Sequence, residues 1–126
     1  MDNYFKERSD TPKGPDGKYD FETVDALDIE LFNNQMNSLI NGETVELPEF
    51  DFLTGTKKYN GKFLTLKPKD VLVVEGIHAL NPILTKFTPA KNKYKIYIAP
   101  ITTLNLDSYT KVSSSDTRFL RRMVRD

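Results

Sequence analysis

The sequence predicts an α/β fold, in which a parallel sheet with flanking helices carries a small antiparallel hairpin. Residues 29–40 repeat apolar side chains at the spacing of one helix face. Residues 71–74 are apolar without interruption, as in a strand that is covered on both faces. Between them lie short alternating segments separated by turn residues, which are typical of hairpin strands. Strands and helices alternate outside this hairpin, as they do in α/β proteins.

The first half of the chain is expected to hold one loop and one helix. Residues 6–20 are rich in Pro, Gly and charged side chains, which indicates an exposed loop. A helix should begin around residues 23–25, because Asp25, Asp28 and Glu30 place negative charge at its positive end. Asn41 and Gly42 supply a left-handed stop.

The second half should supply the hairpin, two strands and two helices. Residues 44–47, 49–53 and 62–66 form a hairpin system over 44–66, with turns at Pro48, Gly55 and residues 60–61. Residues 71–75 form a central parallel strand, and residues 95–99 form a second strand. Helices are expected over 103–111 and 116–125, the latter capped by Ser115 or Asp116.

Composition limits the function classes. The 126 residues suffice for one modest domain, and 18 basic and 18 acidic side chains cancel, so a nucleic-acid or membrane partner is not expected. There is no cysteine, the longest apolar run covers residues 71–74, and the first ten residues are mostly polar. We therefore expect a soluble cytoplasmic protein. Functional-looking residues at position 2 and a helix running to position 125 suggest a fragment of a larger domain.

Two carboxylates are candidates for chemistry. Glu75 ends the apolar run, and ligands of open α/β sheets bind beyond the carboxyl ends of parallel strands. It should meet Mg²⁺ or an arginine there, unless it is a solvent-facing strand end. Asp2 precedes Tyr4 and Phe5, so it could accept a hydroxyl proton while a ring packs on a flat substrate.

Aromatic and acidic residues alternate in two segments, residues 19–22 and 50–52. In an extended backbone the rings of Phe21, Phe50 and Phe52 would share one face, with carboxylates such as Glu22 on the other. The rings could hold a base or sugar, or they could close a small core under the hairpin. His78, the only histidine, is interpreted as a capping or core group.

The last residues carry a stripe of guanidinium groups. Arg118, Arg121, Arg122 and Arg125 lie at i, i+3, i+4 and i+7, which places them on one helix face. Such a face suits a polyanion, because guanidinium forks match phosphate oxygens, although it could also be a solvated basic face. The chain contains no Gly-x-x-x-x-Gly-Lys-Ser/Thr loop, so it could not cradle a nucleoside triphosphate unaided.

Five motifs in order resemble the uridine kinase branch of the uridine kinase and phosphoribulokinase family. They are residues 2–5 (DNYF), 19–28 (YDFE to DALD), 47–52 (LPEFDF), 71–77 (VLVVEGI) and 116–126 (DTRFLRRMVRD). The resemblance covers essentially the whole chain and is strongest to bacterial uridine-kinase-like nucleoside kinases. It implies an incomplete P-loop kinase fold, with the phosphate-loop segment upstream and the lid downstream missing.

The resemblance also implies roles for the candidate residues. Asp2 would be the base for the nucleoside 5′-hydroxyl and, with Glu75, would lie near Mg²⁺. The nucleoside pocket would hold Phe5, Phe21, Phe50 and Phe52, with Glu22 and Arg118 on the sugar side. Arg121, Arg122 and Arg125 would lead to the ATP phosphates. Gly55 stands where animal uridine-cytidine kinases carry a base-reading histidine, so base preference stays open.

Three functions remain possible from the sequence. The first is part of an ATP-dependent nucleoside kinase that transfers the γ-phosphate to a ribose 5′-hydroxyl, inactive in isolation and homo-oligomeric when intact. The second is a phosphoribulokinase or pantothenate kinase, whose substrates would favour extra cations over four phenylalanines. The third is a non-catalytic module that binds a nucleoside or another subunit.

Overall fold

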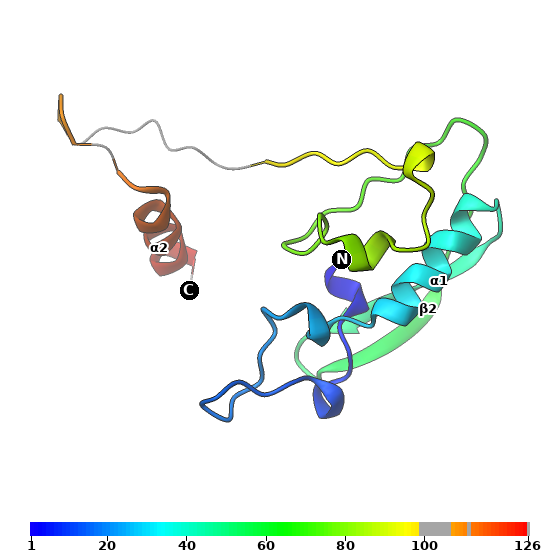
Figure 1. Ribbon diagram of the computed structural model, residues 1–126. Helices are drawn as coiled ribbons and strands as arrows, with labels where there is room; N and C mark the ends of the chain where they lie inside the picture. Colours follow the sequence, from blue (N-terminus) through cyan, green and yellow to red (C-terminus); the bar gives the residue numbers. More distant parts are fainter. Residues whose placement is uncertain (99–106, 111, 126) are drawn as a thin grey trace. The chain divides into compact units, whose positions relative to one another are not determined.

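The computed structural model describes residues 1–98, 107–110 and 112–125, in two units, Met1–Lys95 and Ile96–Asp126, which we treat separately. In the first unit, α1 (Ile29–Ile40) packs along an antiparallel pair of strands, β1 (Val45–Asp51) and β2 (Thr56–Leu64) (Figure 1). Short 3₁₀ turns are η1 (Asp2–Tyr4), η2 (Arg8–Asp10), η3 (Val24–Ala26), η4 (Pro82–Thr85) and η5 (Ala90–Asn92). The second unit contains α2 (Ser114–Arg125).

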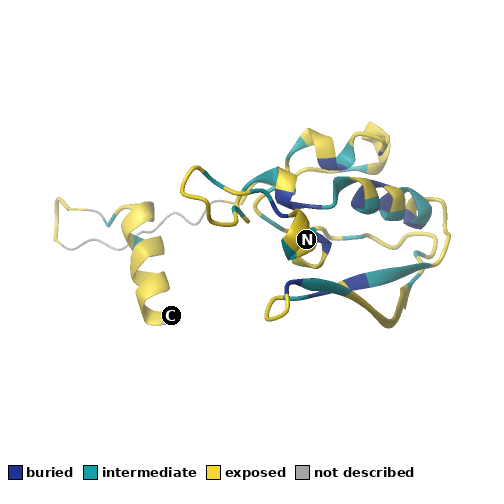
Figure 2. Ribbon diagram, turned by 90° about the horizontal axis from the view of Figure 1, so that it is seen from below, coloured by how far each residue is buried: buried dark blue, intermediate teal, exposed yellow. Residues whose placement is uncertain are grey.

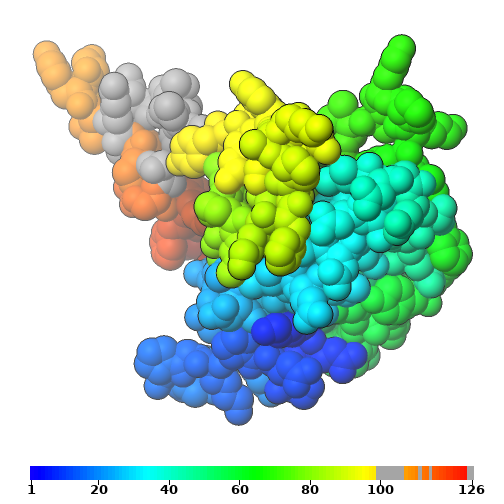
Figure 3. All heavy atoms as spheres, turned by 45° about the vertical axis from the view of Figure 1, so that its right-hand side comes forward, coloured from blue at the N-terminus to red at the C-terminus, as the bar shows by residue number. Residues whose placement is uncertain are grey.

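The core of the first unit lies between α1, the N-terminal turn and η4. Its buried side chains are Tyr4, Leu27, Phe32, Met36, Leu39 and Leu84. Phe32 is 2% exposed and meets the Tyr4 ring edge-on, with ring centroids 5.0 Å apart. The buried side of α1 is dark in Figure 2, and Figure 3 shows the segment around η4 packed directly on this helix. Burial of each large apolar side chain contributes roughly 1.5–3 kcal/mol, so this cluster is the main stabilising feature.

The start of α1 differs from the expected one. The helix begins at Ile29, because Asp28 is its N-cap and accepts a hydrogen bond from the amide of Leu31 at 3.0 Å. The acidic residues upstream belong to the separate turn η3, where Thr23 accepts from the amide of Asp25. The predicted stop is confirmed, since Gly42 has φ +80° and its amide donates to Leu39.

The hairpin has two strands rather than three short segments. Pro48 lies inside β1, not at a turn, and Gly55, with φ +71°, forms the connection as expected. The predicted turn at residues 60–61 is wrong. These residues form a bulge in β2, since β1 advances from Glu46 to Pro48 while β2 advances from 63 to 59. The Gly61 amide, freed from the ladder there, donates to the Glu46 carboxylate at 2.7 Å.

The two predicted parallel strands are not formed. Residues 71–75 and 95–98 are described without strand pairing, and residue 99 lies outside the described part of the chain. A parallel strand exists only when neighbours share its ladder, and no described residue supplies one. The expected parallel sheet is therefore absent from the described residues. Val71 and Val73 stay 84% and 82% exposed, whereas Leu72 packs against the core.

The second unit confirms one helix and corrects another. α2 begins at Ser114, and its cap is neither Ser115 nor Asp116. Ser113 accepts a hydrogen bond from the amide of Asp116 at 3.0 Å, which makes it the capping side chain. The helix expected over 103–111 falls partly on residues 103–106 and 111, outside the described residues. Its described part, 107–110, is a bend in which Asp107 accepts from two following amides.

Candidate functional site

Four phenylalanine rings from three separate segments meet at the end of the hairpin. Phe5 follows η1, and Phe21 lies in the loop before η3. Phe50 lies near the end of β1, and Phe52 lies in the turn that follows this strand. The Phe5 ring centroid lies 5.9 Å from Phe21, 5.7 Å from Phe50 and 6.2 Å from Phe52. We call these four residues the phenylalanine cluster. Sequence alternation had placed the rings on one face, and the structure brings them together.

Exposure within the phenylalanine cluster is graded. Phe50 is buried at 5% exposure, Phe21 is 37% exposed and Phe52 is 59% exposed. A ring cluster that only closed a core would bury its outer members, because exposed aromatic surface is costly in water. Next to it, an open hollow of about 420 Å³ is lined by Phe50, Phe52 and Leu53 together with Glu49, Lys58 and Asn60. The cluster thus offers an accessible apolar edge beside polar groups.

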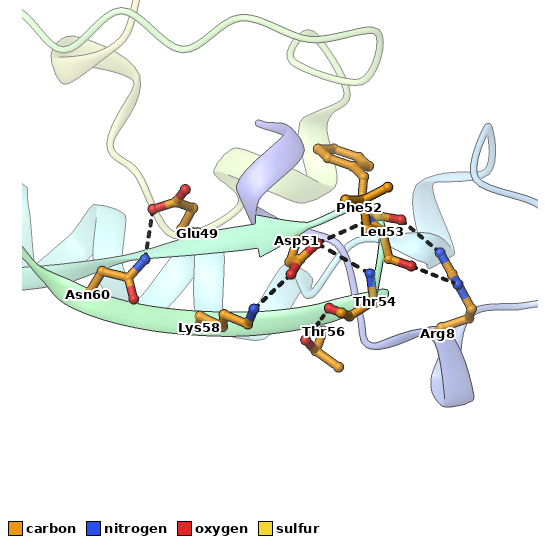
Figure 4. Close-up of polar contacts among 9 residues, drawn as sticks. All are labelled: Arg8, Glu49, Asp51, Phe52, Leu53, Thr54, Thr56, Lys58 and Asn60. Atoms are coloured by element: carbon orange, nitrogen blue, oxygen red, sulfur yellow. Dashed lines mark hydrogen bonds and ion pairs between the residues drawn. The ribbon is translucent and has the colours of Figure 1, made fainter.

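The carboxylates that alternate with the rings are mostly occupied by the backbone. Asp51 accepts the amides of Leu53 and Thr54 and pairs with the Lys58 ammonium at 2.7 Å (Figure 4). These partners, Lys58 first, hold the pKa of Asp51 well below its usual range. Asp20 likewise accepts two amides of its own loop. Both serve as turn-forming groups, so they are not free to bind a sugar.

Glu22 differs from these turn carboxylates. Its side chain is exposed and makes no hydrogen bond or ion pair with any described residue. Its carbonyl accepts a hydrogen bond from His78 Nε2 at 2.8 Å, across 56 residues of sequence. A carbonyl can only accept, so Nε2 carries the proton. His78 therefore ties the Glu22 loop to the segment after Glu75, a contact that no periodic pattern in the sequence signals.

Asp2 and Glu75 come from segments that touch. The N-terminal ammonium of Met1 donates to the Glu75 carbonyl at 3.0 Å, which places the start of η1 beside the end of the apolar run. Asn3 accepts the Phe50 amide at 3.4 Å, so Asp2 also flanks the phenylalanine cluster. Neither carboxylate has a hydrogen-bond or ion-pair partner within the described residues.

Asp2 and Glu75 are the candidate metal ligands of this part of the molecule. Across residues 1–98, 107–110 and 112–125, no three His, Cys, Asp or Glu side chains gather to hold an ion. Mg²⁺ often takes only one or two carboxylates, with water and substrate phosphates as its other ligands. The carboxylates of Asp2 and Glu75 are of the type that could supply one or two of the ligands of Mg²⁺. They could not supply all of its ligands.

The predicted arginine stripe is present on α2. Arg118, Arg121 and Arg122 are exposed on one face, and Arg125 closes the helix. The opposite face is apolar and also exposed, as shown by Phe119, Leu120, Met123 and Val124 at 54–89%. Because the two units are described separately, the expected approach of these arginines to Asp2 and Glu75 stays a prediction.

No helix in the described ranges combines the length and apolar character needed to span a bilayer.

The rings and carboxylates define a candidate site for a small, partly flat, polar molecule. Comparisons with known proteins assign the family. The profile of the Phosphoribulokinase / Uridine kinase family matches residues 4–126. The chain belongs to this family, which confirms the resemblance inferred from the five motifs.

Individual relatives agree with the family profile. The uridine kinase of Macrococcus caseolyticus is 33% identical over the whole chain, which covers 52% of that relative. The uridine kinase of Halobacterium salinarum is 28% identical, again over the whole chain and 48% of the relative. Uridine-cytidine kinase 2-B of Danio rerio is 37% identical over 61% of the chain and 30% of its own length.

Coverage of these relatives is partial. The chain spans about half the length of the curated uridine kinases it matches over its full length. No solved structure matched the chain. Family membership therefore rests on the sequence profile and these relatives, and the two-stranded sheet of the structure corresponds to part of a kinase domain.

Proposed function

We propose that the chain forms the nucleoside-binding part of an ATP-dependent uridine-type kinase, which transfers a γ-phosphoryl group to a ribose 5′-hydroxyl. The supporting observation is the phenylalanine cluster, assembled from three segments with an exposed edge and flanked by Asp2. A nucleoside presents a flat base and a polar sugar, which suits rings beside carboxylates. Family membership and the names of the relatives favour the same substrate class.

The proposal gives each candidate residue a role in binding or phosphoryl transfer. The phenylalanine cluster holds the base and one face of the sugar, and Glu22 accepts hydrogen bonds from ribose hydroxyls. Asp2, whose carboxylate has no described partner, would accept the proton of the 5′-hydroxyl as the new O–P bond forms. The bond between the γ-phosphorus and the bridging oxygen would break in the same transfer, with ADP as the leaving group. Arg118 contacts the sugar side, while Arg121, Arg122 and Arg125 stabilise negative charge on phosphate.

ATP and Mg²⁺ set a limit on what this chain does alone. The 126 residues contain no Gly-rich phosphate loop, so they do not fit ATP as its main binding site. Asp2 and Glu75 would hold Mg²⁺ only together with phosphates. When bound, the ion neutralises charge on the transferring group. The isolated chain is expected to show neither ATP affinity nor turnover.

The test is Asp2→Asn in the complete kinase, assayed for uridine phosphorylation and, separately, for uridine binding. Loss of the base should lower kcat by about 10²–10⁴-fold, because the amide cannot accept the proton, while uridine affinity survives. Asp10→Asn, an equal charge change at an exposed residue in η2, should leave both unchanged. Full turnover in Asp2→Asn would reject Asp2 as the base.

A non-catalytic nucleoside-binding role is the second candidate. The absence of a phosphate loop within the 126 residues favours it for this chain taken alone. A substrate panel on the complete protein separates the candidates. Turnover of uridine supports the kinase, turnover of sugar phosphates or pantothenate supports the related kinases, and uridine binding without any turnover supports the binding module.

A further inference from the structure

Arg8 reaches across the molecule to the turn that joins β1 and β2. Its guanidinium donates to the carbonyl of Phe52 at 2.9 Å and to that of Leu53 at 3.5 Å (Figure 4). The backbone amide of Arg8 donates to the carbonyl of Gly55 at 2.9 Å. These partners lie more than 40 residues away in sequence. Arg8 therefore binds three carbonyls of one turn, those of residues 52, 53 and 55.

Gly55 is the residue that makes this contact possible. Its φ is +71°, and a Cβ at this position would lie 2.6 Å from Arg8 Nε and 2.9 Å from Arg8 Cζ. A carbon atom does not approach non-bonded heavy atoms so closely. Any side chain at residue 55 would therefore displace the guanidinium of Arg8. Arg8 thus fills the space that a side chain of residue 55 would otherwise take.

The same contact bears on the phenylalanine cluster. Phe52 is 59% exposed, so burial alone does not fix its ring. Asp51 holds the turn through the amides of Leu53 and Thr54, and Arg8 holds it through the carbonyls. Arg8 follows Phe5 by three residues on the same segment. Its bonds to the turn therefore fix the spacing of Phe5 and Phe52, whose ring centroids are 6.2 Å apart.

We propose that Arg8 is a positioning residue that sets the exposed edge of the nucleoside pocket by holding Phe52 against Phe5, with Gly55 as its required partner. The substrate assignment rests on the function proposed above, whereas the positioning of Phe52 does not. It follows that residue 55 carries no base-reading side chain in this protein. The side of the pocket next to residue 55 is shaped by backbone carbonyls and by the arginine that they bind.

The experiment uses the 126-residue chain and nuclear Overhauser contacts between aromatic rings. In Arg8→Ala the Phe5–Phe52 contacts should disappear, while Tyr4–Phe32 contacts in the core remain. Arg8→Lys keeps a cation that can reach one carbonyl but not two, and it should retain weakened Phe5–Phe52 contacts. Lys18→Ala removes an equal charge from an 85% exposed side chain and should change nothing. Unchanged Phe5–Phe52 contacts in Arg8→Ala would overturn the proposal.

Two further measurements strengthen the test. Gly55→Ala should also remove the Phe5–Phe52 contacts, because its Cβ would displace the Arg8 side chain from the turn carbonyls. If Arg8→Ala does not fold, Arg8→Lys decides: intact ring contacts there would contradict the proposal. Uridine titration should show about tenfold weaker binding in Arg8→Ala, the size of one lost stacking contact. If the unmutated chain binds no uridine while Arg8→Ala still loses the ring contacts, the proposed function fails and the positioning role stands.

Discussion

The burial of apolar side chains differs between residues 1–66 and residues 67–98. In the first stretch, β1 pairs with β2, and Tyr4, Leu27 and the buried face of α1 form most of the core, to which Leu84 of the second stretch adds. In the second, Val71, Val73 and Ile77 are 70–84% exposed, and residues 71–75 form no strand ladder with any described residue. The first stretch supplies most of the core, whereas the apolar run of the second has the pattern of a sheet strand but pairs with no described residue.

The difference has consequences for the candidate site. The phenylalanine cluster belongs to the first stretch and is held by the hairpin, η1 and Arg8. Glu75 belongs to the second and is held chiefly through the bond from Met1 to its carbonyl. We therefore expect the phenylalanine cluster to keep its arrangement in the isolated chain. The position of Glu75 should depend on strands that would pair with residues 71–75.

The largest effect is expected in the core of the first stretch. Phe32→Ala removes a ring that is 2% exposed and packed on Tyr4, and it should lower the free energy of unfolding by about 3–5 kcal/mol. Val71→Ala, at 84% exposure, should change it by no more than about 0.5 kcal/mol. Urea unfolding followed by circular dichroism measures both. Similar losses for the two variants would remove the distinction between the stretches.

A smaller effect concerns the link between α1 and the hairpin. Asp28 caps α1 and pairs with the Lys57 ammonium at 2.6 Å. Burial acts to raise the pKa of Asp28, but the Lys57 contact and the Leu31 amide outweigh it and lower the pKa below its usual value. The resulting stabilisation is present above the unfolded pKa of about 3.9 and is lost as the pH falls through the folded pKa.

Asp28→Asn tests this link. Asparagine can still cap the helix, so the loss should reflect the charge pair and amount to about 1–2 kcal/mol at pH 7. At a pH below both pKa values the variant and the unmutated chain should be equally stable. Asp10→Asn provides the matched control and should not alter the pH dependence of unfolding. A pH-independent difference for Asp28→Asn would show that Lys57 contributes nothing through charge.

A third variant examines the polar contact beneath the core. The Tyr4 hydroxyl donates to Gln35 Oε1 at 2.7 Å, and Gln35 Nε2 donates to the Glu46 carbonyl at 2.8 Å. Tyr4→Phe leaves Gln35 Oε1 without this donor and should cost about 1 kcal/mol. Burial, with a smaller contribution from Tyr59, raises the pKa of Tyr4 to about 12.

The alkaline behaviour of Tyr4 supplies a second readout. The unfolded tyrosine ionises near pH 10, so the stabilisation tied to the neutral phenol is full below that pH and declines as the pH rises toward 12. Tyr4→Phe should lack this decline. Tyr94→Phe, at a side chain that is 90% exposed, should behave as the unmutated chain. An identical alkaline decline in Tyr4→Phe would assign it to other groups.

The sequence predicted what short-range patterns determine. Helical periodicity and the Gly42 stop located α1, and alternation in residues 50–52 placed two rings of the cluster on one face. It could not predict the Arg8 and His78 contacts, which join residues more than 40 positions apart through single side chains. The strand at 71–75 was wrong for the described chain for another reason. An apolar run indicates that a segment can be buried between two neighbouring strands or layers. It does not show that those neighbours are present.

The smallest effect on stability is expected for a substitution in the exposed run at 71–75, which should mainly change self-association of the chain. Val73 and Leu72 are adjacent, but Val73 is 82% exposed while Leu72 packs on the core. Val73→Ser should leave the free energy of unfolding within about 0.5 kcal/mol and reduce self-association, because unpaired strand edges with apolar side chains recruit other chains. Leu72→Ser should instead lower the free energy of unfolding, because it removes an apolar side chain that packs on the core. Sedimentation velocity over a range of concentrations measures the association. A chain that is monomeric before any substitution would show that the exposed run at 71–75 does not recruit a second copy.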